Sequence, residues 1–336
     1  MAGRIHVITL GGTIAMTGGA SPAAAVVPRL GADALVEAVR PFLPPDLAPT
    51  GESMANRPSA NLAVADIARL ALRIPEAAEE GVAGVVVTQG TDTLEETAFL
   101  LSLFLGTPPV PVVVTGAMRP ASAAGADGPA NLVAAIHLAA DETARAHGVL
   151  VVMAERIFAA ADATKAHTHF VDAFGAHQGA AVGIMREGRA QWLSAPPAPA
   201  APAFDPARFA SAPRLPHVPV VEALFDADPG RALAVLSDAE AAVLRAFGAG
   251  HVPESWVEPL AAFAARRPLV LASRVPFGGV LEASYGYPGS ESDLIARGLI
   301  PAGRLNAQKA RLLLMLLAAE GAAGAGLRSR YARIAG

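Results

Sequence analysis

Two turns of this chain carry hydroxyl groups directly after segments that are typical of buried strands. The first turn is Gly11-Gly12-Thr13, and the second is Gly90-Thr91-Asp92-Thr93. In α/β proteins, ligands bind at the carboxyl ends of parallel strands, which is where both turns are expected to lie. A hydroxyl beside a carboxylate can hold an amino-acid ammonium group and position a nucleophile. Two strand ends that each display a threonine therefore indicate a threonine-dependent amidohydrolase rather than a binding module.

Each turn also has a plainer explanation. Gly11-Gly12-Thr13 is compatible with a tight turn between a strand and a helix. It lacks the third glycine of a dinucleotide-binding motif, so NAD is not supported. Asp92 or Thr93 can cap the following helix, with Glu95 and Glu96 favouring its dipole. Capping does not explain why two hydroxyls and a carboxylate gather at one strand end.

Lysine is scarce in this chain. Lys165 and Lys309 are the only two, and the other 24 of the 26 basic residues are arginine. A lysine in a loop is usually solvated, but a lysine kept in an arginine-biased chain suggests a role that arginine cannot fill. A buried lysine can lose its proton, whereas arginine stays charged. Lys165 is therefore a candidate proton acceptor.

A long irregular segment, 121–129, follows the strand end expected at Thr115. Loops of this length at a strand end are often functional. Arg119 is expected either to bind a carboxylate or to tie the loop down through a salt bridge with Asp127. The salt bridge is the favoured interpretation, because an internal pair is the commoner use of such residues.

Three histidines and an aspartate form a loose group, His167, His169, His177 and Asp172. Their spacing matches no standard zinc pattern. The chain has no cysteine, which excludes disulfides, thiolate catalysis and cysteine-based zinc sites. We therefore expect neither a metal nor a cofactor.

The first half of the chain alternates apolar strands with amphipathic helices. The expected strands are Arg4–Leu10, Gly84–Thr88, Val110–Thr115 and Val149–Ala154. The expected helices are Asp33–Val39, Val64–Ile74, Leu94–Leu105 and Asn131–Ala140. This alternation predicts an α/β fold with a mainly parallel sheet flanked by helices.

A Pro/Ala-rich segment, 194–217, is expected to be an extended linker. It would separate a catalytic α/β domain, 1–193, from a smaller α/β domain, 218–336. In the smaller domain, the expected strands or strand ends are Ala232–Leu236, Ala246–Phe247 and Leu269–Ala272, and the expected helices are Glu254–Ala265 and Asn306–Glu320.

The composition suits a large buried core, since hydrophobic residues make up 53% of the 336 residues and charged residues 17%. A net charge of −4 without a basic run argues against nucleic acid or an anionic membrane as a partner. Residues 4–25 loosely resemble a signal peptide, but His6 and the glycine turn favour a core strand. Nowhere is there an apolar run of ~18 residues that could span a bilayer. A soluble, cytoplasmic protein is predicted.

Five ordered blocks resemble the bacterial-type L-asparaginase/glutaminase family, over most of the chain from Arg4 to about Leu317. Any one block alone is weak evidence, but five in order are specific. The blocks are Thr9–Ala15, Gly90–Thr97, Gly116–Pro120 with Ala126–Pro129, Asp162–Lys165, and Ser273–Pro276 with Asn306–Arg311.

The resemblance implies four catalytic residues. Thr13 is similar to the family's nucleophilic threonine. Thr91, Asp92 and Lys165 match its second catalytic group, in which Lys165 takes the proton from Thr91. In family terms, Asp92 also binds the substrate ammonium group.

The resemblance also implies a substrate pocket made of Ser59, Ala60, Gly90, Ala117 and Glu291. Ser59 would bind the substrate carboxylate, and the Ala117 carbonyl would face the scissile amide. Glu291 matches a carboxylate that reaches the ammonium group from a neighbouring subunit. A homodimer at minimum is then required, and a homotetramer built as a dimer of dimers is expected.

Three positions depart from the family pattern. The lid loop normally supplies a tyrosine that helps to activate the nucleophile, but residues 16–29 contain none, and Ala25 or Val26 is the nearest match. Ala60 stands where many members have a glutamine or serine that touches the substrate. The family's asparagine near Gly248 is missing, and His251 is the expected replacement.

The leading hypothesis is hydrolysis of L-asparagine to L-aspartate and ammonia through a threonine acyl-enzyme. The first alternative is an amidohydrolase of the same fold that acts on glutamine or another amide. The second is a non-catalytic amino-acid sensor that kept the pocket. The missing tyrosine favours the sensor, whereas survival of Thr13, Thr91, Asp92 and Lys165 together favours the enzyme.

Overall fold

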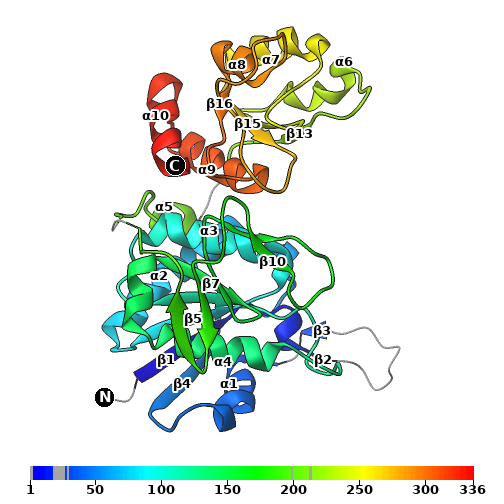
Figure 1. Cartoon of the computed structure of the whole chain (residues 1–336). Helices are drawn as coiled ribbons and strands as arrows, with labels where there is room; N and C mark the ends of the chain where they lie inside the picture. The colour runs from blue at the N-terminus through cyan, green and yellow to red at the C-terminus, as the bar shows by residue number, and fades with distance from the viewer. Residues whose placement is uncertain (1–2, 18–26, 29, 198–199, 212–213) are drawn as a thin grey trace. The chain divides into compact units, whose positions relative to one another are not determined.

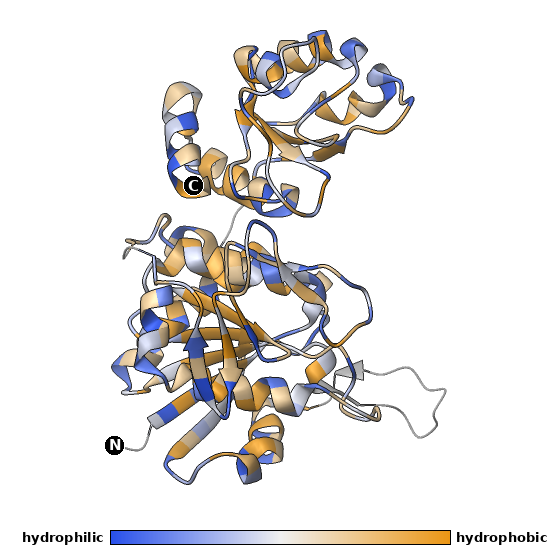
Figure 2. Cartoon of the chain, in the orientation of Figure 1, coloured by the Kyte–Doolittle hydropathy of each residue, from blue (hydrophilic) through white to orange (hydrophobic). Residues whose placement is uncertain are grey.

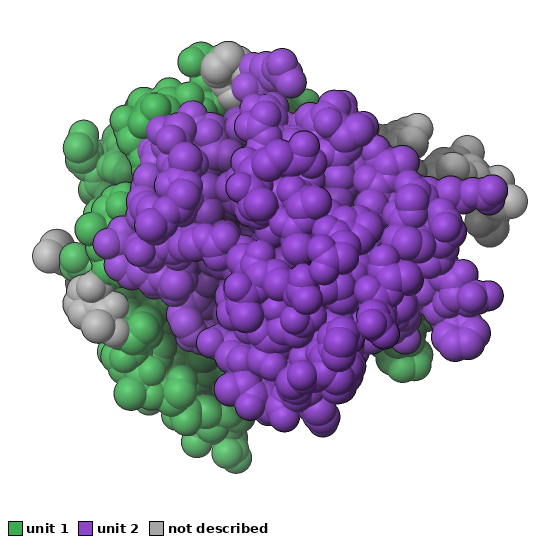
Figure 3. Space-filling model, turned by 90° about the horizontal axis from the view of Figure 1, so that it is seen from above, with its two compact units in different colours: residues 1–212 green, residues 213–336 purple. Residues whose placement is uncertain are grey.

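The computed structural model describes residues 3–17, 27–28, 30–197, 200–211 and 214–336 (Figure 1). The chain divides into two compact units, 1–212 and 213–336, which Figure 3 colours separately. Most of 16–29, including Ala25 and Val26, lies outside the described residues, and so does the lid expected there.

The first unit is built on an eight-stranded sheet with the order β12-β11-β8-β7-β6-β5-β1-β4. Strands β4, β1, β5, β6 and β7 run parallel, and β8, β11 and β12 are antiparallel additions. Their bounds are β1 Gly3–Thr9, β4 Leu47–Ser53, β5 Gly84–Thr88, β6 Val112–Thr115, β7 Val149–Met153, β8 Arg156–Ala159, β11 Gly183–Arg186 and β12 Arg189–Trp192. Strands β5, β6 and β7 are buried along their whole length, which explains their continuous apolar sequences (Figure 2).

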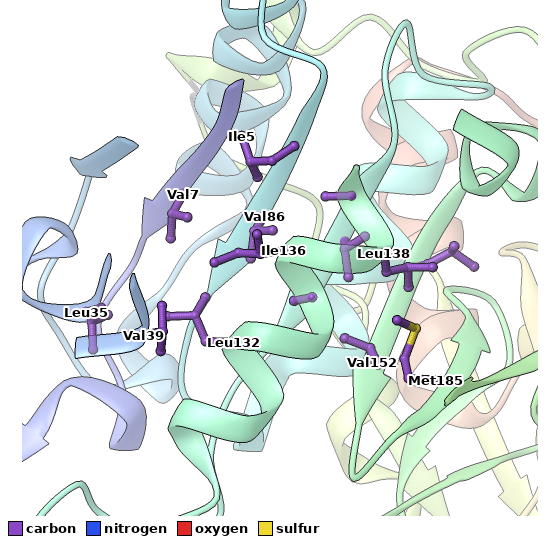
Figure 4. Close-up of a cluster of buried hydrophobic side chains, with 14 of the residues drawn as sticks. Ile5, Val7, Leu35, Val39, Val86, Leu132, Ile136, Leu138, Val152 and Met185 are labelled. Carbon is purple, nitrogen blue, oxygen red and sulfur yellow. The ribbon is translucent and has the colours of Figure 1, made fainter. Parts of the chain in front are cut away.

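Helices cover both faces of this sheet (Figure 1). Their bounds are α1 Ala32–Val39, α2 Val64–Glu79, α3 Leu94–Leu105, α4 Gly128–Ala139 and α5 Ala207–Ala210. In Figure 4, Leu35 and Val39 of α1 share one core with Leu132 and Ile136 of α4 and with Val86 of β5. Each such buried aliphatic side chain stabilises the fold by roughly 1.5–3 kcal/mol, so this face of the sheet is held firmly.

Shorter elements complete the first unit. The two-stranded pairs are β2 Met16–Thr17 with β3 Val27–Pro28, and β9 Ala163–Lys165 with β10 Phe174–Ala176. The 3-10 helices are η1 Thr13–Ala15, η2 Arg40–Phe42, η3 Ser59–Asn61, η4 Thr91–Thr93 and η5 Glu142–His147. Three of these, η1, η3 and η4, follow strand ends of the parallel sheet.

The α/β fold predicted from the sequence is confirmed. The expected strands of the first half correspond to β1, β5, β6 and β7, and the expected helices to α1, α2, α3 and α4. Helix α2 continues through Pro75 to Glu79, past its predicted end. The sequence analysis does not identify β4, because its Pro49 and Gly51 are residues that weaken a strand and suit only an edge.

The second unit contains a four-stranded parallel sheet with the order β13-β14-β15-β16. Its strands are β13 Val220–Glu222, β14 Ala242–Ala246, β15 Leu269–Ser273 and β16 Ile300–Pro301. Its helices are α6 Pro229–Ala232, η6 Ala234–Leu236, η7 Glu254–Trp256, α7 Val257–Ala264, α8 Glu291–Ala296, α9 Ala307–Ala319 and α10 Gly324–Ala335. A parallel sheet in a smaller α/β unit agrees with the predicted fold class.

Two strand predictions in this unit need correction. The expected strand Ala232–Leu236 is wrong, because that segment is the end of α6 followed by η6. Asp228 caps α6 by accepting the Arg231 amide at 2.9 Å, and Pro229 fits its first turn. The expected strand end Ala246–Phe247 is only the last residue of β14, since the strand begins at Ala242.

The segment 194–217 is not extended throughout. It contains α5, which contacts α2, and it buries Phe204 and Phe209. The Phe209 ring lies 5.7 Å from that of Phe104, and the Ala210 carbonyl accepts a hydrogen bond from Arg69 at 2.8 Å. Two aromatic side chains thus hold this Pro/Ala-rich stretch on the first unit, which extends to residue 212.

Candidate active site

The two threonine-bearing turns lie at neighbouring strand ends of the first unit. Strands β1 and β5 pair in parallel with Thr9 beside Thr88, so both end at the same level of the sheet. The Leu10 amide donates to the Thr88 carbonyl at 2.8 Å and continues the pairing. The chain then enters η1, which starts at Thr13, and η4, which starts at Thr91. Both turns therefore open at one edge of the sheet.

Glycines let the two turns touch. Gly12 has a φ of +88°, and a Cβ atom placed on it would lie 1.9 Å from the backbone nitrogen of Gly90. Since backbone atoms cannot give way as a flexible side chain can, any residue larger than glycine is excluded here. The residue before Thr13 is thus held against the residue before Thr91. Thr13 itself is partly exposed.

Lys165 joins the second turn from a distant part of the chain. Its Nζ donates to Thr91 Oγ1 at 2.8 Å and to Asp92 Oδ1 at 2.7 Å. Thr91 is 5% exposed and the Lys165 side chain 17%, whereas the Asp92 side chain is 74% exposed. The buried hydroxyl therefore has an amine beside it, and the carboxylate that holds this amine stays open to a ligand.

A short hairpin places Lys165. Strand β9 pairs antiparallel with β10, with Lys165 opposite Phe174, and β9 contacts α3. At the tip, His167 Nδ1 accepts the backbone amides of His169 and Phe170 at 3.0 Å, and its ring stacks on that of Phe170. His167 thus shapes the hairpin. In the part of the chain that the structure describes, no group of three or more His, Asp or Glu side chains is arranged to hold a metal ion.

Ser59 lies beside the second turn, as the first residue of η3. It is 4% exposed, and its Oγ would lie 2.8 Å from a Cβ atom placed on Gly90. Its carbonyl accepts a hydrogen bond from Thr93 Oγ1 at 3.0 Å. Ala60, the next residue, is exposed. Thr93 therefore ties η3 to the turn, a role that the sequence analysis did not assign because the two segments are 34 residues apart.

Ala117 is fully buried after the end of β6. Asp127 accepts the amides of Met118 at 2.9 Å and Arg119 at 2.8 Å, which fixes the loop on both sides of its turn. Asn131 Nδ2 donates to Asp127 Oδ2 at 3.1 Å and to the carbonyl preceding Ala117 at 3.0 Å. Asn131 is thus a positioning residue that the sequence analysis missed; its only signal there was a polar residue in an apolar helix.

The expected salt bridge between the side chains of Arg119 and Asp127 is wrong, because each side chain bonds to backbone atoms instead. Asp127 does tie the loop down, but through the backbone amides, because a buried carboxylate accepts those donors at short range. The Arg119 guanidinium instead donates to the Gly125 carbonyl at 3.1 Å. This interaction leaves Arg119 near the surface of the loop, where it is partly exposed.

Glu291 belongs to the second unit, where it begins α8. Its side chain is completely buried, and Oε1 accepts the amides of Ser284 and Tyr285, each at 2.8 Å. Its Oε2 lies 3.1 Å from Nε2 of His251. The two residues that the sequence analysis singled out separately in this half, His251 and Glu291, are therefore hydrogen-bonded to each other.

Burial acts to raise the pKa of Glu291, but donors outweigh it. These donors are the amides of Tyr285, Ser284 and Glu291 itself, together with the His251 side chain, and the net effect lowers the pKa. The carboxyl group is therefore ionised at neutral pH.

Comparison with known proteins assigns both units. The family model described as "Asparaginase, N-terminal" matches residues 4–198, and "Glutaminase/Asparaginase C-terminal domain" matches residues 217–329. Within the described residues, no helix has the length and apolar character needed to cross a membrane.

Three similar proteins illustrate the match. A probable L-asparaginase of Deinococcus radiodurans is 38% identical over 81% of this chain and 82% of its own length. L-asparaginase 2 of Escherichia coli is 34% identical over 93% of this chain and 88% of its own length. A crystal structure of a probable cytoplasmic L-asparaginase from Campylobacter jejuni has a TM-score of 0.81 at 31% identity, covering 98% of this chain and 99% of that one.

Proposed function

The chain belongs to the asparaginase family, and we propose that it hydrolyses L-asparagine to L-aspartate and ammonia through a threonine acyl-enzyme. The observation that carries the proposal is the contact of Lys165 Nζ with both Thr91 and Asp92. It joins a buried hydroxyl, an amine and an open carboxylate beside the Thr13 turn. Simple binding of an amino acid would need the carboxylate but not the contact between the Thr91 hydroxyl and the Lys165 amine.

The chemistry follows from these groups. Amide hydrolysis needs a nucleophile, a base that later acts as an acid, and donors for the oxyanion. Thr13 Oγ forms an ester bond with the amide carbon, the carbon–nitrogen bond breaks, and the hydroxyl proton of Thr13 goes to the leaving nitrogen, so that ammonia departs. In the second step, the Lys165 amine takes a proton from Thr91, and Thr91 takes one from the water that attacks the ester. The proton on Lys165 then goes to Thr13 Oγ as the ester splits and aspartate leaves.

The pocket residues have supporting roles in this proposal. Ser59 binds the substrate carboxylate, and Asp92 binds its ammonium group through the exposed face of its carboxylate. Gly90 admits the ligand because it has no side chain. The backbone at Ala117, which Asp127 and Asn131 brace, faces the scissile amide.

A second candidate is hydrolysis of glutamine or another amide. The family model that matches the second unit is described by both activities, and Ala60 leaves an exposed small side chain beside Ser59. Alanine at this position leaves more room for the longer side chain of a substrate such as glutamine than a glutamine residue there would.

Ammonia release from purified protein tests the proposal. L-asparagine and L-glutamine are supplied side by side, with Thr13→Ala as the control that lacks the nucleophile. We expect rapid release from asparagine, slower release from glutamine and none from the variant. No release from either amide by the wild-type protein would contradict the proposal and point to a sensor or another amide. Faster release from glutamine would favour the second candidate.

We further propose a cytoplasmic homotetramer, a dimer of dimers in which Glu291 and its neighbours serve the site of another subunit. Static light scattering on a sizing column gives the mass directly, and the monomer is 34.1 kDa. A monomer that hydrolyses asparagine at full rate would contradict the shared site.

A further inference from the structure

A cavity of about 370 Å³ lies wholly within the second unit. It is at the amino ends of the parallel strands, because Glu240 precedes β14, Pro268 precedes β15 and Ile300 begins β16. His251 and its partner Glu291 follow the opposite, carboxyl ends of β14 and β15. The cavity is therefore separate from the loops that carry this pair.

Three arginines from two elements line this cavity. Arg266 and Arg267 follow the end of α7, and Arg328 belongs to the first half of α10 (Figure 1). Arg266 Nε donates to the Ala262 carbonyl at 3.1 Å, and the Arg328 guanidinium donates to the Gly298 carbonyl. Within the part of the chain that the structure describes, none of the three forms an ion pair with a carboxylate. A cation near the end of a helix is favourable, but that accounts for Arg266 and Arg267 and not for the gathering of three.

Among the described residues that line the cavity, Glu240 is the one with an acidic side chain. Its Oε1 already accepts the His217 amide at 3.1 Å and the Arg214 guanidinium at 3.4 Å. Three arginines against one carboxylate give the lining a net charge of +2, although the whole chain carries −4. The cavity therefore favours an anion.

The segment that joins α9 to α10 supplies the cavity with small residues and leaves room for an organic group. Ala318, Gly321, Ala322 and Gly324 line it, and Leu327 adds an apolar side chain. A Cβ atom placed on Gly321 or Gly324 would meet no atom within 4 Å. Pockets for small organic molecules usually measure about 300–1,000 Å³, and this cavity lies in that range. It therefore offers more space than a simple anion fills.

We propose that this cavity binds a phosphomonoester with an organic body, of the size of a nucleoside monophosphate. A phosphomonoester carries a charge of about −1.5 to −2 at pH 7 and has three acceptor oxygens, which matches a net charge of +2 and three guanidinium groups. A carboxylate offers a single charge and two oxygens. Guanidinium groups also stack on flat rings, so they contact both parts of such a ligand.

The experiment is calorimetry of the full chain at low salt with three probes, AMP, inorganic phosphate and adenosine. Arg266→Gln and Arg267→Gln each remove one charge from the cavity, and Ala322→Phe fills part of its space. Arg333→Gln is the matched control, because Arg333 is an exposed arginine of α10 that does not line the cavity. Thermal melting of each variant reports folding.

The inference predicts that one AMP binds per chain with a Kd below about 1 mM, and that inorganic phosphate and adenosine each bind at least tenfold more weakly. Arg266→Gln and Arg267→Gln each raise the Kd for AMP about tenfold, the size of one hydrogen bond to a charged group. Ala322→Phe weakens AMP more than inorganic phosphate, because it takes the space of the organic body and keeps the arginines. Arg333→Gln leaves the Kd for AMP unchanged.

Other results overturn the inference. One is a wild-type protein that does not bind AMP. Another is a Kd for AMP that is the same in folded Arg266→Gln and Arg267→Gln as in the wild-type protein, which would place AMP elsewhere on the chain. Inorganic phosphate or adenosine that binds as tightly as AMP would show that half of the ligand is superfluous. These results are independent of the proposed hydrolysis, since calorimetry with AMP needs no turnover of an amide.

Discussion

Both units hold a carboxylate and a nitrogen base at the end of a parallel sheet, but they expose opposite members of the pair. In the first unit, Asp92 is 74% exposed and Lys165 is mostly enclosed. In the second, Glu291 is 0% exposed and His251 is the member that reaches the surface. The presence of a carboxylate in a motif therefore does not determine whether that carboxylate or its partner is the accessible group.

The largest expected effect comes from the enclosed base of the first unit. Lys165→Arg keeps a cation beside Asp92 but cannot give up its proton, and Lys165→Met keeps neither. We expect both to lower kcat for asparagine by about 10³-fold, within the range usual for loss of a general base. Ammonia release measures kcat, and calorimetry with aspartate shows that the product still binds. An arginine variant with wild-type kcat would show that only the charge matters.

Substitution of Gly12 in the first unit and Gly250 in the second is expected to have the next largest effect, a loss of stability. Gly12→Ala would put a Cβ atom 1.9 Å from backbone, whereas Gly250→Ala meets the end of the Val280 side chain at 2.7 Å. We expect Gly12→Ala to cost more than about 4 kcal/mol of stability and Gly250→Ala clearly less. Gly81→Ala is the control, because its φ is +84° and nothing lies within 4 Å. Its cost is the backbone strain alone, about 1 kcal/mol. Denaturant unfolding of the three variants measures the differences, and equal costs would refute the close contact of the two turns.

The stability of variants at acid pH is expected to distinguish the buried carboxylate of Glu291 from the exposed carboxylate of Asp92. The pKa of Glu291 is lowered in the fold, so its stabilising contribution is present above the ordinary carboxyl pKa and is lost as pH falls through the lowered value. Glu291→Gln is expected to cost about 2 kcal/mol at neutral pH and progressively less in acid. Asp92→Asn, at a mostly exposed position, is the control and should change stability by less than about 1 kcal/mol. Melting temperatures measured from pH 7 down to about pH 3 test this prediction. A difference between Glu291→Gln and the wild-type protein that stayed constant over this range would contradict it.

The smallest effect concerns the turn between β7 and β8. Glu155 has a φ of +63°, which is strained for a residue with a side chain, and the second unit has Asp226 at +57°. Glu155→Gly should stabilise the protein by about 0.5 kcal/mol, because relief of strain slightly exceeds the added freedom of the unfolded chain. Asp226→Gly should gain less, since aspartate tolerates this conformation better. A destabilised Glu155→Gly variant in thermal melting would count against the strain.

Much of the fold follows from local sequence. Strands β5, β6 and β7 are buried on both faces, so their apolar runs identify them. Edge strand β4 contains Pro49 and Gly51 and has no such signal. The apolar residues of Ala232–Leu236 suggest a strand, but Asp228 and Pro229 start a helix just before them, and the segment is helical.

The site is predictable only in part, because its contacts join distant segments. Thr91 and Lys165 are 74 residues apart, and only the family resemblance links them before the structure does. His251 and Glu291 are 40 residues apart, and their hydrogen bond depends on a loop conformation that no local pattern indicates. The sequence identifies His251 and Glu291 as candidates, but it does not show which of the two is buried.

The central claim is that Thr13 carries the acyl group while Thr91 serves as the base for the water that splits the ester. The direct measurement is mass spectrometry of peptides from protein quenched in acid during turnover of asparagine. The account predicts an aspartyl ester on the peptide that contains Thr13 and its absence in Thr13→Ala. In Thr91→Ala, the ester is present only if that variant forms the ester faster than it hydrolyses it. An ester on Thr91 of the wild-type protein, or turnover by Thr13→Ala, would contradict it.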